Sequence, residues 1–235
     1  MLNTSLSHTL QVTNLSVAVG HKTILQDLSF AIRAGEKLAL LGANGAGKST
    51  LLKCLSGELN HYQGQIQFAG QELSAWQAIK RAKQLAVMPQ KVELMFPFRV
   101  DQVVALGRAP YGDESQSQHL QQAAMQAVDI WHLRRRTYPQ LSGGEQQRVQ
   151  LARVLCQIWQ PVHNLQGQSQ PRALLLDECT SALDPNHQHA VMDLVGRFAE
   201  QGVATLAVMH DISLAAPVAV LNYSVMPRYW PIPMT

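Results

Sequence analysis

A glycine-rich loop between an apolar run and a helical pattern is the feature that most constrains the fold of this chain. It consists of Gly42, Ala43, Asn44, Gly45, Ala46, Gly47, Lys48, Ser49 and Thr50, and it fits the P-loop pattern GxxxxGK[ST]. Glycines let backbone N–H groups turn toward phosphate oxygens, and the helix that follows directs its positive end at the same phosphates. Lys48 can add charge at the β- and γ-phosphates, and Ser49 can ligate Mg²⁺. The loop predicts nucleotide binding and leaves ATP and GTP as alternatives. A glycine-rich turn without a ligand is disfavoured, because the pattern is complete and both flanking elements are present.

Strand and helix patterns alternate along the chain. Apolar and polar residues alternate at 10–19 and 65–68, which predicts half-exposed antiparallel strands. Nearly continuous apolar runs, typical of strands buried on both faces of a parallel sheet, occupy 37–41, 173–176 and 203–209. Helical patterns occupy 48–56 (ended by Gly57), 116–130, 144–159 and 186–201. This alternation predicts an α/β fold.

Two acidic residues follow the apolar run at 173–176. If the run is a buried strand, Asp177 and Glu178 stand where that strand ends, at the phosphate edge of the sheet. Asp177 can then hold the Mg²⁺ shell, and Glu178 can polarise an attacking water. A strand that simply ends in solvated acids is the alternative, and the intact P-loop makes it the weaker one.

Composition excludes several classes of protein. Of the 235 residues 46% are hydrophobic and 15% charged, which favours a packed core over disorder. The net charge of +3 comes from 19 basic and 16 acidic residues scattered along the chain, so no nucleic-acid interface is expected. Cys54, Cys156 and Cys179 lack CxxC spacing, which is typical of thiols in a reducing compartment. We expect neither a secretion signal nor a membrane span.

A further motif brings in a resemblance to a known family. Its residues are Leu141, Ser142, Gly143, Gly144 and Glu145, followed by Gln146, Gln147 and Arg148. The segment resembles the signature motif of the ATP-binding-cassette (ABC) ATPases. The resemblance implies a P-loop NTPase (RecA-like) α/β core with an antiparallel β subdomain and an inserted α-helical subdomain. It also implies a homodimer, in which the signature of one subunit covers the γ-phosphate of ATP held by the P-loop of the other.

Other segments match the family's motifs in the family's order. Gln90 is similar to the Q-loop glutamine, and His210 is similar to the switch histidine that contacts the γ-phosphate. The D-loop, which packs across the dimer in the family, corresponds to Ser181, Ala182, Leu183 and Asp184. The resemblance implies that Glu178, His210 and Gln90 are catalytic. It also implies that Mg²⁺ is held by Ser49, Gln90 and Asp177.

The resemblance also divides the chain. Residues 1–91 and 142–216 correspond to the nucleotide-binding core and 92–141 to the helical subdomain, whereas 217–235 form an atypical, proline-containing tail. We expect the C-terminus to be truncated or frameshifted relative to the family, leaving the sheet without its last strands and exposing an edge. Val19 stands where the family carries an aromatic residue that stacks on adenine, and Cys179 replaces a proline.

The cargo is predicted from a finer resemblance. Residues 54–58, 96–110 and the loop 159–171 are similar to ATPases that import haem, within a group that also imports iron chelates and cobalamin. This implies two transmembrane permease subunits, a periplasmic substrate-binding protein as indirect partner, and a place at the cytoplasmic face of the inner membrane. Two alternatives stay open. One is a soluble ABC ATPase outside transport, and the other is an impaired or unstable subunit.

Overall fold

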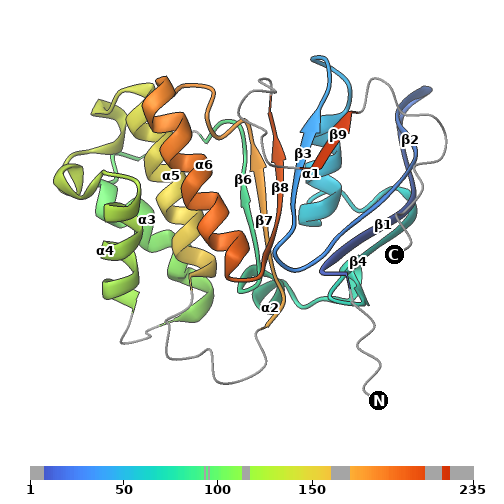
Figure 1. Cartoon of the computed structure of the whole chain (residues 1–235), viewed down its shortest axis with the longest axis horizontal. Coiled ribbons are helices and arrows are strands. Elements are labelled where there is room, and N and C mark those ends of the chain that lie inside the picture. The colour runs from blue at the N-terminus through green and yellow to red at the C-terminus, as the bar shows by residue number, and fades with distance from the viewer. Residues whose placement is uncertain are drawn as a thin grey trace.

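A parallel β-sheet forms the centre of the computed structural model, which describes residues 8–92, 94, 96–112, 117–159, 170–209 and the backbone of 219–222. Across the sheet the order is β6 (Leu85–Met88), β7 (Arg172–Asp177), β8 (Val203–Val208), β3 (Lys37–Leu41) and β9 (Ala219–Asn222). Every residue of β7 and β8 is buried, as the continuous apolar runs predict. Because neighbouring strands are parallel, the segments that follow β3, β6 and β7 meet at one edge of the sheet (Figure 1).

A second, antiparallel sheet lies beside the first one (Figure 1). Its order is β2 (Lys22–Ile32), β1 (Leu10–Val19), β4 (Gln63–Phe68) and β5 (Gln71–Glu72). The alternating patterns at 10–19 and 65–68 predict β1 and most of β4. Nothing in the sequence analysis predicts β2, whose pairing with β1 contains several register shifts. Such irregularities interrupt the alternation of apolar and polar residues by which a strand is recognised.

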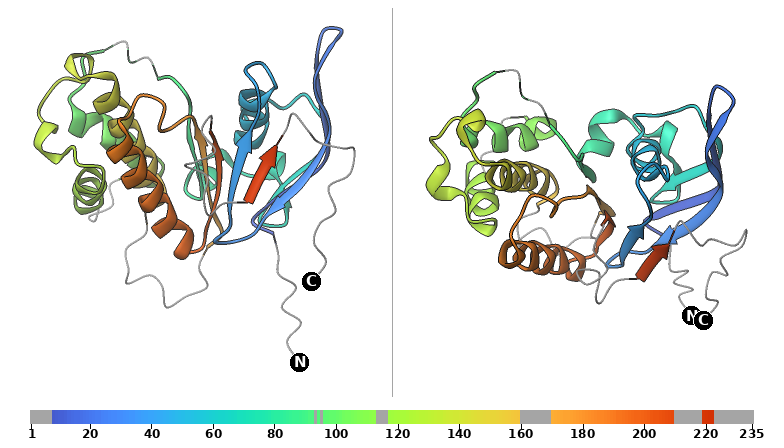
Figure 2. Two further views of the ribbon diagram at one scale, coloured as in Figure 1. Left: turned by 45° about the horizontal axis from the view of Figure 1, so that its top comes forward. Right: turned by 90° about the horizontal axis from the view of Figure 1, so that it is seen from above.

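Six α-helices occur in the described part of the chain: α1 (Lys48–Ser56), α2 (Ala78–Ala82), α3 (Val100–Ala105), α4 (Ser117–Ala127), α5 (Gly143–Ile158) and α6 (Pro185–Glu200). Short 3₁₀ turns lie at Leu73–Ala75, Leu106–Tyr111, Trp131–Leu133 and Tyr138–Gln140. Helix α1 lies between the two sheets, whereas α5 and α6 cover the opposite face of the parallel sheet (Figures 1 and 2).

The parallel sheet therefore contributes to two hydrophobic cores. Leu174 and Leu176 of β7 belong to the core shared with α3, α4, α5 and α6. Leu175, on the other face of the same strand, packs in the core formed with α1 and the antiparallel sheet. Side chains alternate between the faces of a strand, so β7 packs in both cores. This packing holds the C-terminal end of β7 between the two cores.

Local sequence signals set the ends of the helices that border the site. Helix α1 ends at Gly57, which has a φ of 72° and whose N–H donates to the carbonyl oxygen of Cys54. Helix α5 begins with a capping box, in which the Ser142 Oγ accepts from the Glu145 N–H and the Glu145 side chain accepts from the Ser142 N–H. Asp184 caps α6.

The segment between residues 92 and 141 carries α3 and α4. In the described part of this segment, the β-structure is limited to one isolated bridge. This agrees with its helical pattern, while the assigned domain boundaries stay predictions. Strand β9 falls within the atypical tail and pairs in parallel with β3, so part of the tail extends the sheet that we expected to lack further strands. His210 and the remaining tail residues lie outside the described residues. None of the helices described is both long and apolar enough to span a bilayer.

Candidate functional site

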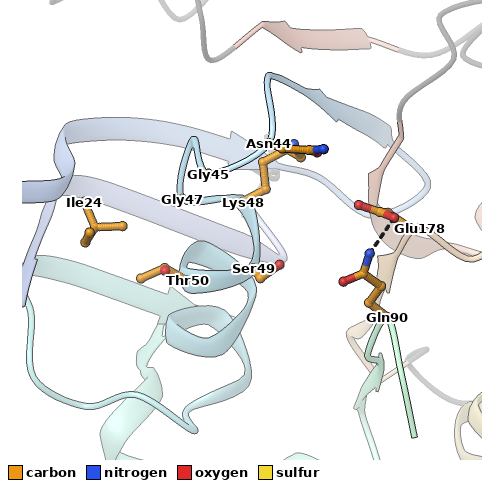
Figure 3. A pocket seen from close by; sticks show the side chains of 9 residues that line it. All are labelled: Ile24, Asn44, Gly45, Gly47, Lys48, Ser49, Thr50, Gln90 and Glu178. Atoms are coloured by element: carbon orange, nitrogen blue, oxygen red, sulfur yellow. Dashed lines mark hydrogen bonds between the residues drawn. The ribbon is translucent and has the colours of Figure 1, made fainter.

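A pocket of about 480 Å³ opens at the edge where the parallel strands end. Its lining consists of Ile24, Asn44, Gly45, Gly47, Lys48, Ser49, Thr50, Gln90 and Glu178 (Figure 3). The loop from β3 to α1 contributes most of these residues, and Gln90 and Glu178 come from the segments after β6 and β7. The P-loop and the acidic pair, far apart in the sequence, thus meet at one site.

The conformation of the loop requires glycine at its last turn. Gly47 has a φ of 91°, a region that side chains with a Cβ rarely adopt. A Cβ at this position would also lie 2.8 Å from Cδ2 of Leu25 and 3.0 Å from the carbonyl oxygen of Ile24. The loop therefore packs directly against β2, and this packing sets the direction in which α1 begins.

Lys48 lies inside the loop and not in solvent. The residue is 7% exposed, and Nζ donates to the carbonyl oxygens of Gly42 at 2.6 Å and Ala43 at 2.9 Å. A buried ammonium needs such acceptors. The loop thus keeps one positive charge beside the N-terminus of α1, which is an arrangement suited to phosphate.

Ser49 and Asp177 join the loop to the end of β7. The Ser49 hydroxyl donates to Oδ2 of Asp177 at 3.0 Å, and Asp177 is buried. Mg²⁺ prefers oxygen ligands and usually binds one or two carboxylates together with substrate phosphates. No cluster of three or more His, Cys, Asp or Glu that could hold a metal occurs among the described residues. A hydroxyl and a buried carboxylate beside a phosphate site therefore fit Mg²⁺ bound jointly with a nucleotide.

Glu178 and Gln90 meet across the pocket from Lys48 (Figure 3). The Gln90 Nε2 donates to Oε2 of Glu178 at 2.7 Å. Glu178 has a φ of 52°, which costs a non-glycine residue about 1–3 kcal/mol. The surrounding structure must hold this backbone, and strain of this kind concentrates at functional sites. The neighbouring Cys179 is buried, and burial raises its thiol pKa to about 12, so it adds no charge beside Glu178 at neutral pH.

The signature and D-loop residues lie next to each other but do not line this pocket. A Cβ on Gly144 would stand 2.9 Å from the carbonyl oxygen of Ala182, so α5 begins in close contact with the D-loop. Hydrogen bonding to the backbone N–H of Ser142 lowers the pKa of Glu145. The same type of bond, from His187, lowers the pKa of Asp184. Both carboxylates therefore stay ionised and stabilise the helix ends they cap.

Sequence analysis missed two residues that the structure adds to this region. Ile24 of β2 lines the pocket, whereas Val19, the position matched to the adenine-stacking residue, is 67% exposed. Gln147 contacts the backbone of Glu178. Ile24 belongs to the strand that the alternation pattern did not reveal, and Gln147 was visible only as a neighbour of the signature. The catalytic, Mg²⁺-binding and signature roles stay predictions.

Substitution of Gly47 provides a test of the loop geometry. Gly47→Ala places a Cβ at a φ of 91° and against the Ile24 carbonyl, so we expect the loop to shift and ATP affinity to fall at least about tenfold, the equivalent of 1.4 kcal/mol. Calorimetric titration with ATP and Mg²⁺ measures this loss.

Gly196→Ala is the matched control. Gly196 lies within α6, and its added Cβ would approach only Nζ of Lys37, at 3.8 Å. Alanine is the better helix former by about 0.8–1 kcal/mol, so this variant should bind ATP normally and melt at the same or a higher temperature. Unchanged ATP affinity in Gly47→Ala would contradict the geometry described for the loop.

Comparison with known proteins agrees with this geometry. Residues 25–181 match the family described as ABC transporter. The chain is 49% identical, over 88% of its length and 79% of the relative, to a hemin import ATP-binding protein HmuV of Pseudomonas fluorescens. It is 47% identical, with the same coverage, to a protein of that name from Pseudomonas aeruginosa. A solved structure described as a metal-chelate type ABC transporter in an inward-facing conformation superposes with a TM-score of 0.72 at 28% identity, covering 93% of this chain and 81% of the other.

Proposed function

This chain belongs to the ABC transporter family of ATP-hydrolysing proteins, and we propose that it powers the import of haem through a separate membrane permease. The observation that carries the proposal is the 49% identity, across 88% of the chain, to a protein named for hemin import. A nucleotide-sized pocket with a complete P-loop supports the ATP-dependent part. Related iron chelates or cobalamin are the alternative cargoes.

Five side chains in or beside the pocket have separate chemical tasks in this proposal. Lys48 and the amides of the loop bind the β- and γ-phosphates of ATP. Ser49, Asp177 and Gln90 hold Mg²⁺, which neutralises phosphate charge when bound. Glu178 orients a water molecule and accepts its proton. The hydrogen bond from Gln90 to Glu178 supports this geometry, because it directs the carboxylate into the pocket.

The assembly proposed is a homodimer docked on two permease subunits. Ser142 and the N-terminus of α5 offer an anion-binding surface, which lies outside the chain's own pocket. A second subunit would bring its signature to this pocket, with the D-loop at the junction. ATP binding then closes the dimer and hydrolysis reopens it, which drives the permease. The permease holds the chain at the cytoplasmic face of the inner membrane, and a periplasmic binding protein delivers the cargo. His210 would contact the γ-phosphate, as its place in the sequence suggests.

Complementation tests the transport part of the proposal. We expect this chain to restore growth on haem as sole iron source in a Pseudomonas fluorescens strain that lacks its own hemin import ATP-binding protein. A Lys48→Met variant should restore no growth, because it lacks the charge that binds the phosphates.

The cargo is settled by running the assay on several iron sources. If growth is restored only on a ferric chelate, that chelate and not haem is the cargo. No restoration on any source, with the chain expressed and hydrolysing ATP, would contradict a role in iron import.

A further inference from the structure

One side-chain amide joins the signature helix to the backbone of Glu178. Gln147 lies near the start of α5, and its Nε2 donates to the carbonyl oxygen of Glu178 at 2.7 Å. Its Oε1 accepts from the backbone N–H of Ala182 at 3.0 Å. The orientation of the amide is fixed by these partners, since only the nitrogen can donate to a carbonyl and only the oxygen can accept from an N–H.

The backbone of Glu178 depends on a small set of hydrogen bonds. Its N–H donates to the carbonyl oxygen of Val208 at 3.2 Å. Its carbonyl oxygen accepts from the Ser181 N–H at 3.2 Å and the Ser181 hydroxyl at 3.0 Å, in addition to Gln147. The bond from Gln147 is the shortest of these, and it joins Glu178 to α5, whereas both bonds from Ser181 come from the segment between β7 and α6. Since Glu178 holds a φ of 52°, the peptide orientation that directs its carboxylate toward Gln90 needs such restraint.

We propose that Gln147 is a positioning residue for the reaction: it holds the peptide of Glu178 so that the carboxylate faces the pocket. The inference rests on the proposed role of Glu178 as the base. Gln147 does not line the pocket, so it acts through Glu178 and not on the nucleotide. The same amide also ties the D-loop at Ala182 to α5, so a movement of the signature helix is transmitted to the catalytic carboxylate.

Two substitutions of Gln147 separate positioning from packing. Gln147→Leu keeps the approximate size and removes both hydrogen bonds. Gln147→Glu keeps the acceptor for Ala182 and loses the donor to Glu178. Misplacement of a reacting group by about 1 Å can cost a hundredfold in rate, so for both variants we expect kcat at pH 8 to fall by about tenfold or more. The KM for ATP should change by less than about threefold, because binding contacts are untouched.

The pH profile of Gln147→Glu provides a readout that a packing role would not move. A protonated carboxyl group carries one O–H donor and one acceptor, which reproduces the two bonds of the amide. The kcat of this variant relative to the unmodified chain should therefore rise as the pH falls from 8 to 6, because only the protonated carboxyl group can donate to the carbonyl oxygen of Glu178. The ratio for Gln147→Leu should stay constant over the same range.

Gln157→Leu is the matched control, and ATP hydrolysis by the purified full chain is the assay. Gln157 lies on the same helix and donates to the carbonyl oxygens of Ala82 and Leu85, away from the pocket. The Gln157→Leu variant should melt at a lower temperature than the unmodified chain but keep the same kcat.

Two patterns of results would overturn the inference. If Glu178→Gln is inactive while both Gln147 variants turn over normally, Gln147 does not position the base and the proposed function stands. If the Gln147 variants lose activity only in proportion to their loss of melting temperature, the role of Gln147 is structural. Full activity of Glu178→Gln would instead remove the premise, and with it the proposed mechanism.

Discussion

Glu178→Gln should lower the ATP turnover of this chain about a hundredfold to ten-thousandfold while ATP binding persists, the range that general base catalysis supplies. The substitution preserves size, and the new amide oxygen can still accept from Gln90, which donates to Glu178 at 2.7 Å. The fold around the end of β7 is held by backbone contacts such as that of Glu178 with Val208, and these are unchanged. What disappears is the carboxylate that accepts a proton from water.

Turnover measured under Mg²⁺ and ATP, together with calorimetric ATP affinity, tests this expectation. Glu200→Gln is the control, because Glu200 is an exposed carboxylate at the end of α6; it should hydrolyse ATP at the unmodified rate. If Glu178→Gln turns over within about threefold of the unmodified chain, a change worth less than 1 kcal/mol in the barrier, another group must activate the water.

Much of the core and the phosphate loop could be predicted from the sequence, because both follow local rules. Helix α1 has the predicted bounds, Lys48–Ser56, since glycines stand immediately before and after it. The apolar runs predicted β7 and β8, because a strand that is buried on both faces is apolar at nearly every position. The sequence placed Asp177 where a buried strand ends, at the phosphate edge of the sheet, and in the structure Asp177 accepts a hydrogen bond from Ser49 there.

The remainder depends on contacts that no local pattern encodes. Glutamate has no preference for positive φ, so the φ of 52° at Glu178 could not be anticipated. The partners that bond its backbone, Gln147 and Val208, are distant in the sequence. The four-residue strand β6 was too short to be recognised by periodicity. Ile24 reaches the pocket because β2 lies under the loop, and this contact depends on tertiary packing that no local pattern predicts.

Arg172 is a buried charge whose role follows from the ends of two helices. It is the first residue of β7 and is 1% exposed. Its Nη1 donates to the carbonyl oxygen of Ile158, the last residue of α5, at 3.2 Å. Its Nη2 donates to the carbonyl oxygen of Gln201, just after α6, at 2.8 Å. Burial lowers the pKa of the guanidinium, a cost that is offset because the C-terminal ends of helices carry partial negative charge and unpaired carbonyls.

Arg172→Leu should therefore reduce the free energy of unfolding by about 3 kcal/mol, since two buried carbonyl groups each lose a partner at about 1–3 kcal/mol, partly offset by removal of a buried charge. For a chain of this size the melting temperature should fall by roughly 6–12 °C. The stability of Arg172→Lys should lie between that of the unmodified chain and that of Arg172→Leu, because an ammonium lacks the planar fork that reaches both helices.

Urea unfolding followed by circular dichroism measures the change, and Arg197→Leu is the matched control. Arg197 is exposed on the last turn of α6, and its loss should shift stability by no more than about 0.5 kcal/mol. A similar small effect at Arg172 would mean that the two helix ends find other partners. A large effect would show that the bonds from this one arginine to the ends of α5 and α6 hold both helices on the sheet.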